Sequence, residues 1–271
     1  MIEQLTSAFT IPVIRYAFFG MLMAGGTLSL LGVIIVSLHL TAIRFTLMHV
    51  GLLGAAAGLS LGFSPTLGAF TLVIVTSMVM GRLGKERNLS ASSVSGLFMT
   101  GSLAGAFLLL AATGVPAMNV FDIFAGNILL MTRGDLIFII ILGIGILGVF
   151  WIAYREIQLV LLDKALARSL GLPVDEIVTG MFLLLGIGVA TALRLVGALL
   201  VDAIILLPGI AALRFARSFG MALFLSALFG ILACAGGFFL SLFLNLPIGA
   251  SAAMVSTLIL AISMLLKNTI H

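Results

Sequence analysis

The sequence predicts an all-α protein that crosses a lipid bilayer many times. Of its 271 residues, 62% are hydrophobic and 8% are charged, and the mean hydropathy is +1.37. Soluble domains carry about 25% charged residues. Several stretches of about 20 residues lack any charge, and a helix of that length crosses the hydrocarbon core of a membrane. The alternating polar and apolar positions of a β-barrel are absent, so we expect a bundle of transmembrane helices.

The expected spans follow from charge-free windows that are divided at Gly, Pro and short polar turns. The windows are residues 16–38, 45–81 (long enough for two helices), 88–120, 136–154, 177–193, 218–243 and 247–266. The resulting spans are residues 13–38, 43–63, 65–82, 91–113, 135–154, 176–193, 195–213, 219–243 and 247–266. Around Arg194 two interpretations stay open, a boundary between two spans or a broken or re-entrant helix. We therefore expect eight or nine spans.

The orientation follows from the positions of Lys and Arg, which are enriched in cytoplasmic loops. Basic residues occur in the loops 81–87, 155–172 and 214–217, and all three fit on the inside if the chain has nine spans. This arrangement places residues 114–134 and 245–249 outside, the N-terminus outside and the C-terminus inside. The same bias accounts for the net charge of +4 without any nucleic-acid partner.

We expect one membrane domain over residues 1–271, because no linker or low-complexity tract divides the chain. The N-terminal residues 1–16 lack the basic region and the cleavage site of a signal peptide. The single cysteine, Cys234, lies in an apolar span and indicates no disulfide framework. Asp122 and Asp135, in the expected outer region, are interpreted as helix caps or as contacts for another protein.

Signatures of enzymes are missing. Residues 81–86, GRLGKE, do not meet the spacing of a phosphate-binding loop, and no strand is expected before them. No Ser/His/Asp set or soluble zinc spacing occurs. An acid–base pair of His49 and Asp202 would be the remaining enzymatic interpretation, but neither residue has clustered polar neighbours in the sequence. The chain is therefore expected to hydrolyse no ATP itself and to bind no cofactor.

The longest polar loop, about residues 155–173, contains a short helical segment. Asp163 is placed to cap it or to lie in its first turn, and Gly171-Leu172-Pro173 should end it. Periodicity alone leaves open whether this helix only decorates the surface or docks a partner.

The sequence resembles the permease subunits of ABC importers for zinc, manganese and iron. Residues 163–174, DKALARSLGLPV, resemble the coupling loop of that family. Three further matches follow in family order and cover much of the chain: FAGNILLMTRGDL (124–136), VGALLVDAIILLPGIAALRFARS (196–218) and LNLPIGASAAMVSTLILAIS (244–263).

This resemblance implies a multi-pass protein of a prokaryotic inner or plasma membrane that works with several partners. A dimer of cytoplasmic ABC ATPases, which would carry ATP and Mg²⁺, would bind the coupling helix. An extracytoplasmic binding protein would deliver the cargo, and a second permease copy would complete the pathway as a homodimer. The residues implied in coupling are Asp163, Leu166, Ala167, Leu170 and Gly171.

The resemblance also implies where the cargo crosses. The second span of the family typically reads G-D-a-l-S-H-a-v-l-p-G, and this chain keeps the histidine as His49. Arg44, Phe45 and Met48 replace the family's first glycine, its acid and its serine. Asp202 lies in a later span, where a lone carboxylate is costly unless it has a partner or a wet cavity.

His49, Asp202 and Met48 could therefore form a translocation site for a divalent transition metal. Alternatively, Asp202 pairs with Arg44 or Arg194 and only ties helices together. The cargo would be zinc, manganese or iron, or else a metal chelate or another small solute. A competing interpretation is a secondary transporter or channel that needs no ATPase.

Overall fold

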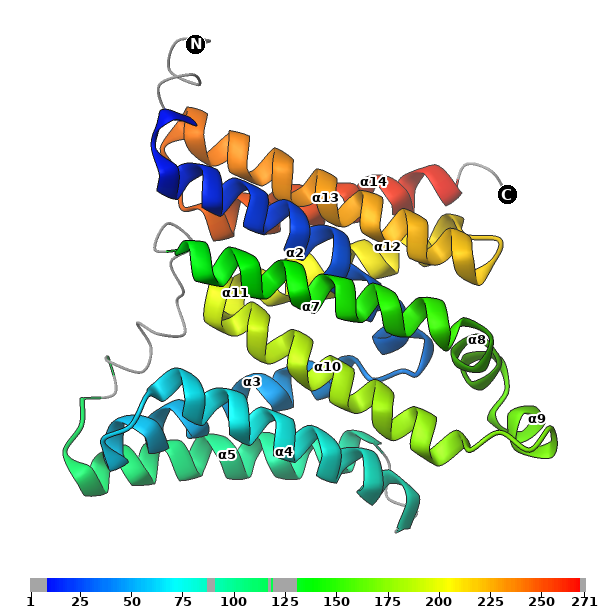
Figure 1. Cartoon of the computed structure of the whole chain (residues 1–271), viewed down its shortest axis with the longest axis horizontal. Coiled ribbons are helices and arrows are strands. Elements are labelled where there is room, and N and C mark those ends of the chain that lie inside the picture. Colours follow the sequence, from blue (N-terminus) through cyan, green and yellow to red (C-terminus); the bar gives the residue numbers. More distant parts are fainter. Residues whose placement is uncertain (1–8, 87–90, 117, 119–130, 269–271) are drawn as a thin grey trace. The chain divides into compact units, whose positions relative to one another are not determined.

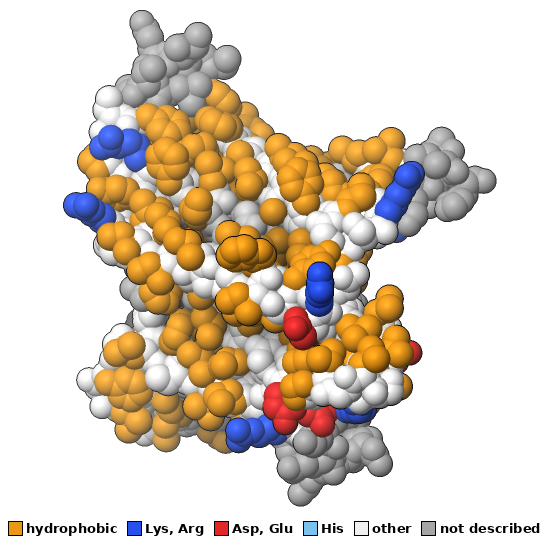
Figure 2. Space-filling model, turned by 45° about the vertical axis from the view of Figure 1, so that its right-hand side comes forward, with side chains coloured by type: hydrophobic (Ala, Val, Ile, Leu, Met, Phe, Trp, Pro, Cys, Tyr) orange, Lys and Arg blue, Asp and Glu red, His pale blue; other side chains and the backbone are white. Residues whose placement is uncertain are grey.

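The computed structural model describes residues 9–86, 91–116, 118 and 131–268. Every regular element in these ranges is a helix (Figure 1), which confirms the all-α prediction. Eight of the helices are long and apolar enough to cross a membrane. Hydrophobic side chains cover much of the face shown in Figure 2, and charged side chains are few on it, as expected of a surface that faces lipid.

The helices follow the expected spans closely. They are α2 (Pro12–Ser37), α3 (Thr41–Leu61), α4 (Pro65–Glu86), α5 (Ala91–Thr113), α7 (Arg133–Ile152), α8 (Tyr154–Leu162), α9 (Lys164–Ser169), α10 (Val174–Val196), α11 (Ala198–Val201), the π-helical segment η2 (Asp202–Leu206), α12 (Leu207–Phe215), α13 (Phe219–Leu244) and α14 (Ile248–Asn268).

The interruption expected at Arg194 lies elsewhere. Helix α10 continues through Arg194 to Val196, and the chain breaks at Gly197, whose φ is 77°. A residue without a Cβ adopts this left-handed conformation at little cost, so Gly197 and not the charged residue ends the helix. The span expected over residues 195–213 is a broken one, made of α11, η2 and α12, and its apolar helical part is the shorter Ala203–Phe215.

Contacts divide the chain into two compact units that interleave along the sequence. Unit 1 comprises Met1–Val33, Gly126–Val149 and Leu195–His271. Unit 2 comprises Ile34–Ala125 and Phe150–Arg194. The helices α2, α7 and α10 therefore each contribute to both units. The single membrane domain expected from the sequence stays a prediction.

Unit 1 is packed through glycines that let helix backbones touch. In α2, Gly25 lies against the backbone of Gly230 in α13, and Gly32 lies against the carbonyl of Ile205 in η2. Seven residues further along α13, a Cβ added to Gly237 would overlap Ala252 of α14. Small residues serve this purpose in membranes because lipid gives helices no hydrophobic reason to associate, and close van der Waals contact must do so.

The π-helical segment η2 is held by a hydroxyl group from another helix. In a π-helix each carbonyl accepts from the N–H five residues ahead, and for Ala203 that residue is Pro208, which has no N–H. The Ser256 hydroxyl of α14 donates to the Ala203 carbonyl instead, at 2.7 Å, and this hydrogen bond is buried. The backbone polar group that the proline leaves open is thereby satisfied inside the apolar interior.

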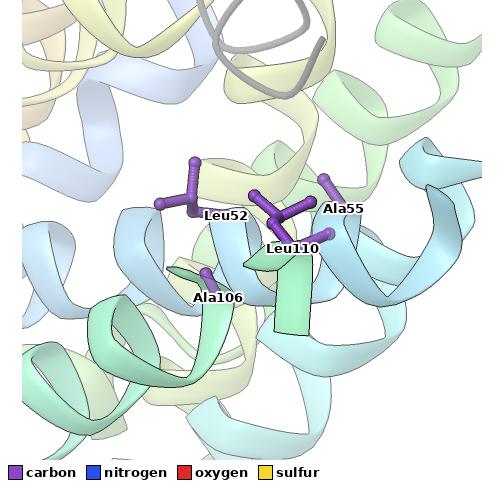
Figure 3. Packing of buried hydrophobic residues seen from close by; sticks show 5 residues of the cluster. Leu52, Ala55, Ala106 and Leu110 are labelled. Atoms are coloured by element: carbon purple, nitrogen blue, oxygen red, sulfur yellow. The ribbon is translucent and has the colours of Figure 1, made fainter. Parts of the chain in front are cut away.

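Unit 2 is built on a three-helix core of α3, α4 and α5. Figure 3 shows Leu52 and Ala55 of α3 packed with Ala106 and Leu110 of α5, all almost fully buried. On another side of α3, Gly54 lies against the backbone of Gly68 in α4.

Helix α10 packs against α4 in the antiparallel sense. A Cβ on Gly81 would lie 3.1 Å from the Thr179 Cα, and a Cβ on Gly186 would lie 2.7 Å from the Ser77 Cβ. The end of α4 and the start of α10 therefore meet at the same end of unit 2. Residues 81–86, expected to be a loop, form the last turns of α4, and the segment 155–172 contains α8 and α9. The basic residues of both segments therefore lie toward the same end of unit 2, as the distribution of charge predicts.

Candidate functional site

The N-terminus of helix α9 is capped by a side chain. Asp163 precedes it in an extended conformation, and its Oδ1 accepts hydrogen bonds from the N–H groups of Ala165 at 2.7 Å and Leu166 at 3.1 Å. A carboxylate in this position satisfies donors that the first turn of a helix leaves free. The capping role predicted for Asp163 is confirmed.

The C-terminus of α9 is closed by a Schellman motif. Gly171 has a φ of 80°, its N–H donates to the Arg168 carbonyl at 3.0 Å, and the Leu172 N–H donates to the Ala167 carbonyl at 3.1 Å. This pair of bonds is the standard way in which a left-handed glycine ends a helix. The end of the helix predicted at Gly171 is therefore confirmed, with its physical cause.

Between these two caps, α9 presents apolar side chains to the outside. Leu166 is 44% exposed and Leu170 is 63% exposed, whereas Ala167 is fully buried against the rest of unit 2. We call Leu166 and Leu170, together with the exposed Asp163 and Gly171, the docking surface. Figure 1 shows α8 and α9 at the end of unit 2 where α10 begins. Ala167 belongs to the anchored side of the helix and not to this surface.

An ion pair that the sequence analysis missed joins α9 to α10. The Arg168 Nη2 lies 2.9 Å from the Asp175 Oδ1, and the two residues lie on either side of the Gly171–Leu172–Pro173 turn. The sequence feature that could have indicated this ion pair is two opposite charges on either side of the helix end predicted at Gly171. Such a pair is common in polar loops, so the sequence alone did not single it out.

His49 lies on α3 in unit 2 and is half-buried, as is Met48. The His49 Nδ1 lies 2.7 Å from the Phe45 carbonyl oxygen. A carbonyl only accepts, so Nδ1 carries a proton and donates, and of the two neutral tautomers only the one with a free lone pair on Nε2 fits this contact. The backbone thus fixes the tautomer that leaves Nε2 able to bind a metal ion.

Arg44 brings a positive charge onto the same helix. It is 8% exposed, its Nε donates to the Thr41 carbonyl at 3.1 Å, and its guanidinium carbon lies 4.2 Å from the centre of the Phe45 ring. The ring face stabilises the cation. Helix α3 therefore carries an imidazole, a thioether and a guanidinium, and it has no carboxylate.

Asp202 is the first residue of η2 and belongs to unit 1, whereas His49, Met48 and Arg44 belong to unit 2. The side chains of Asp202 and Arg194 lie outside the described residues. The grouping of His49, Met48 and Asp202, and the alternative ion pairs of Asp202, stay predictions. Among the residues that the structure describes, no group of three or more His, Cys, Asp or Glu side chains is placed to hold a metal ion.

Asp135 caps α7. Its Oδ2 accepts from the N–H and the hydroxyl of Thr132, at 3.0 and 2.7 Å, and the Thr132 hydroxyl lies 3.2 Å from the Asp135 N–H. This is a capping box, in which two side chains satisfy each other's backbone groups. The prediction for Asp135 as a cap is confirmed, while Asp122 lies outside the described residues.

Comparison with known proteins assigns the chain to a family. Residues 10–267 match the family model described as "ABC 3 transport family". The chain belongs to the ABC 3 transport family. This membership confirms the resemblance drawn from the sequence, and it confirms a multi-pass membrane protein of the ABC permease type.

Several relatives are named as membrane proteins of metal transport systems. The manganese transport system membrane protein MntC of Halalkalibacterium halodurans is 26% identical over 215 residues, which is 79% of this chain and 74% of that protein. The high-affinity zinc uptake system membrane protein ZnuB of Buchnera aphidicola is 26% identical over 251 residues, which is 91% and 96% of the two chains.

A solved structure has the same fold. PsaBC from Streptococcus pneumoniae, determined in complex with Fab, matches with a TM-score of 0.83 and 23% sequence identity. The match covers 97% of this chain and 95% of that chain.

Proposed function

We propose that this chain is the permease subunit of an ATP-driven importer for a divalent transition metal. The observation that carries the proposal is α9, a short helix capped at both ends that exposes Leu166 and Leu170 in a polar loop. Apolar side chains on a rigid cytoplasmic helix are costly in water and favourable in a protein interface. Membership in the ABC 3 family supports the same partner, an ABC ATPase.

The transport cycle needs partners beyond this chain. A dimer of ATPase subunits holds ATP and Mg²⁺ and pulls on the docking surface when it closes. A second copy of the permease completes the pathway, and an extracytoplasmic protein supplies the cargo. Rocking of the helix bundles then exposes the site to alternate sides of the membrane. The chain itself performs no hydrolysis in this scheme.

Manganese or zinc is the proposed cargo, and iron is the third candidate from the sequence. The names of the relatives support manganese and zinc. The Nε2 of His49 suits these metals, and Met48 adds a soft sulfur. Asp202 would supply the oxygen ligand.

A metal chelate or another small solute is the second candidate for the cargo. It is favoured by Arg44, whose buried positive charge disfavours a bare cation near α3 and favours an anionic complex.

The proposal is tested by purifying the complex and reconstituting it in vesicles. We expect the chain to co-purify with an ATPase, and uptake of manganese or zinc to require ATP, with elemental analysis to identify what enters. ATP-independent uptake driven by an ion gradient would instead establish a secondary transporter. Uptake of the metal only as a complex with an added chelator would establish the second cargo class.

His49→Ala and Asp202→Ala should each lower metal uptake by about tenfold or more, because each removes a metal ligand. The folded permease and its association with the ATPase should be unchanged. His49→Gln is a useful companion, since it retains a polar side chain of similar size without the imidazole lone pair. Initial uptake rates at several metal concentrations provide the measurement. Wild-type rates for both alanine variants would remove the two residues from the path.

A further inference from the structure

We propose that the Arg168–Asp175 ion pair is a positioning element, which transmits movement of the docking surface on α9 to helix α10 and from there to the helix that carries His49. The inference rests on the proposed function, because it requires an ATPase that moves α9. It concerns residues outside the docking surface and outside the candidate metal ligands.

The first step is that α9 moves as one body. Asp163 closes its N-terminus and the Schellman motif around Gly171 closes its C-terminus. Its first and last turns are therefore hydrogen-bonded without help from neighbouring helices. A force applied to Leu166 or Leu170 displaces the whole helix and does not unwind one of its ends.

The second step is the link between α9 and α10. Arg168 lies in the last turn of α9, and Asp175 lies in the first turn of α10. These are the ends at which helix dipoles favour a cation and an anion, respectively. The 2.9 Å contact between Arg168 Nη2 and Asp175 Oδ1 bridges the turn, which adds a side-chain link to the backbone connection.

The third step is the packing of α10 within unit 2. Gly81 of α4 packs against Thr179 of α10, and Gly186 of α10 packs against Ser77 of α4. At both glycines an added Cβ would lie closer than 3.2 Å to the neighbouring helix, so the two helices are in close contact. Surfaces packed this closely move together, because protein interiors have few voids to absorb a displacement.

The fourth step leads from α4 to α3. Gly54 of α3 lies against the backbone of Gly68 in α4, again without room for a side chain. Helix α3 carries His49 five residues before Gly54. All these contacts lie in unit 2, so a continuous packed route runs from the docking surface to the candidate metal ligand.

The strength of the ion pair fits transmission better than folding. The Arg168 side chain is 58% exposed and that of Asp175 is 33% exposed. Ion pairs in such positions contribute little to global stability. Loss of the pair should therefore leave the permease folded, and should change how well ATP hydrolysis is converted into transport.

The test uses the reconstituted permease–ATPase complex and measures metal transported per ATP hydrolysed. Arg168→Asp and Asp175→Arg should each lower this ratio by about threefold to tenfold, while the amount of assembled complex stays as in the wild type. The double variant, Arg168→Asp with Asp175→Arg, restores an ion pair, but its reversed polarity opposes both helix dipoles. It should therefore recover only part of the loss and give a ratio above that of either single variant. Glu176→Gln, one residue from Asp175 and also in the first turn of α10, is the matched control and should leave the ratio unchanged.

Three outcomes would overturn the inference. They are an unchanged ratio in both single variants, a double variant no better than the single ones, or a loss of assembled complex with an unchanged ratio. The proposed function fails separately, if the wild-type complex shows no ATP-dependent uptake. A wild type that transports with ATP and charge variants that transport equally well would leave the proposed function standing and remove only the ion pair.

Discussion

Leu166→Asp is expected to abolish ATP-dependent uptake while the permease still folds. Leu166 is 44% exposed on α9, so a polar side chain there costs the isolated permease little. In the complex, a carboxylate would have to be buried in the ATPase interface without a partner, which costs several kcal/mol. The measurement is co-purification of the ATPase together with stimulated ATP hydrolysis. Leu166→Met, which preserves the apolar volume, should retain both.

Gly171→Pro should have the same result through the backbone. The φ of Gly171 is 80°, whereas proline fixes φ near −65° and removes the N–H that donates to the Arg168 carbonyl. The C-terminus of α9 would reopen, and the leucines would lose their fixed position. Gly171→Asn is the matched control, because asparagine tolerates the left-handed conformation. ATPase stimulation retained in both Leu166→Asp and Gly171→Pro would refute the docking role of α9.

Gly32→Ala should destabilise unit 1. A Cβ at this position would overlap the Ile205 carbonyl of η2 and would also lie 3.3 Å from the Gly209 Cα of α12. The obstacle is backbone, so no side chain can rotate away, and α2 must separate from η2 and α12. We expect a loss of about 1–3 kcal/mol or more in the free energy of unfolding.

Thermal unfolding in detergent, with size-exclusion profiles, measures this effect. Gly145→Ala in α7 is the control within the same unit, because nothing lies within 4 Å of a Cβ added there. It should unfold like the wild type. Equal midpoints for Gly32→Ala and Gly145→Ala would mean that the contact between α2 and η2 is not required.

Sequence reasoning located the helices well where charge or turn residues mark their ends. The span expected over residues 91–113 coincides with α5 (Ala91–Thr113), and that expected over 219–243 coincides with α13 to within one residue. Lipid demands uninterrupted helices, so the sequence signal is strong. Asp163 and Gly171 were also identified correctly, because caps depend on a few neighbouring residues.

Structural features that depend on residues far apart in the chain could not be predicted from the sequence. The charge of Arg194 suggested that the helix is interrupted there, but the conformation of Gly197 ends it. The π-helical segment is apolar apart from Asp202, its sequence does not mark a π-helix, and it is stabilised from α14, far along the chain. The predicted grouping of His49 with Asp202 joins residues of different compact units, and hydrophobic patterns carry no information about such a grouping.

The Ser256 hydroxyl of α14 is needed for stability only because Pro208 of α12 has no N–H for the Ala203 carbonyl. Ser256→Ala should cost about 1–2 kcal/mol, because the Ala203 carbonyl would lose its donor. In a Pro208→Ala background the backbone amide at 208 can serve that carbonyl, and the same serine change should become nearly silent. Thermal unfolding of the two single variants and the double variant would measure this epistasis. Homologous chains that exchange this proline for another residue are thereby free to lose the distant hydroxyl, so the two positions should drift as a linked pair.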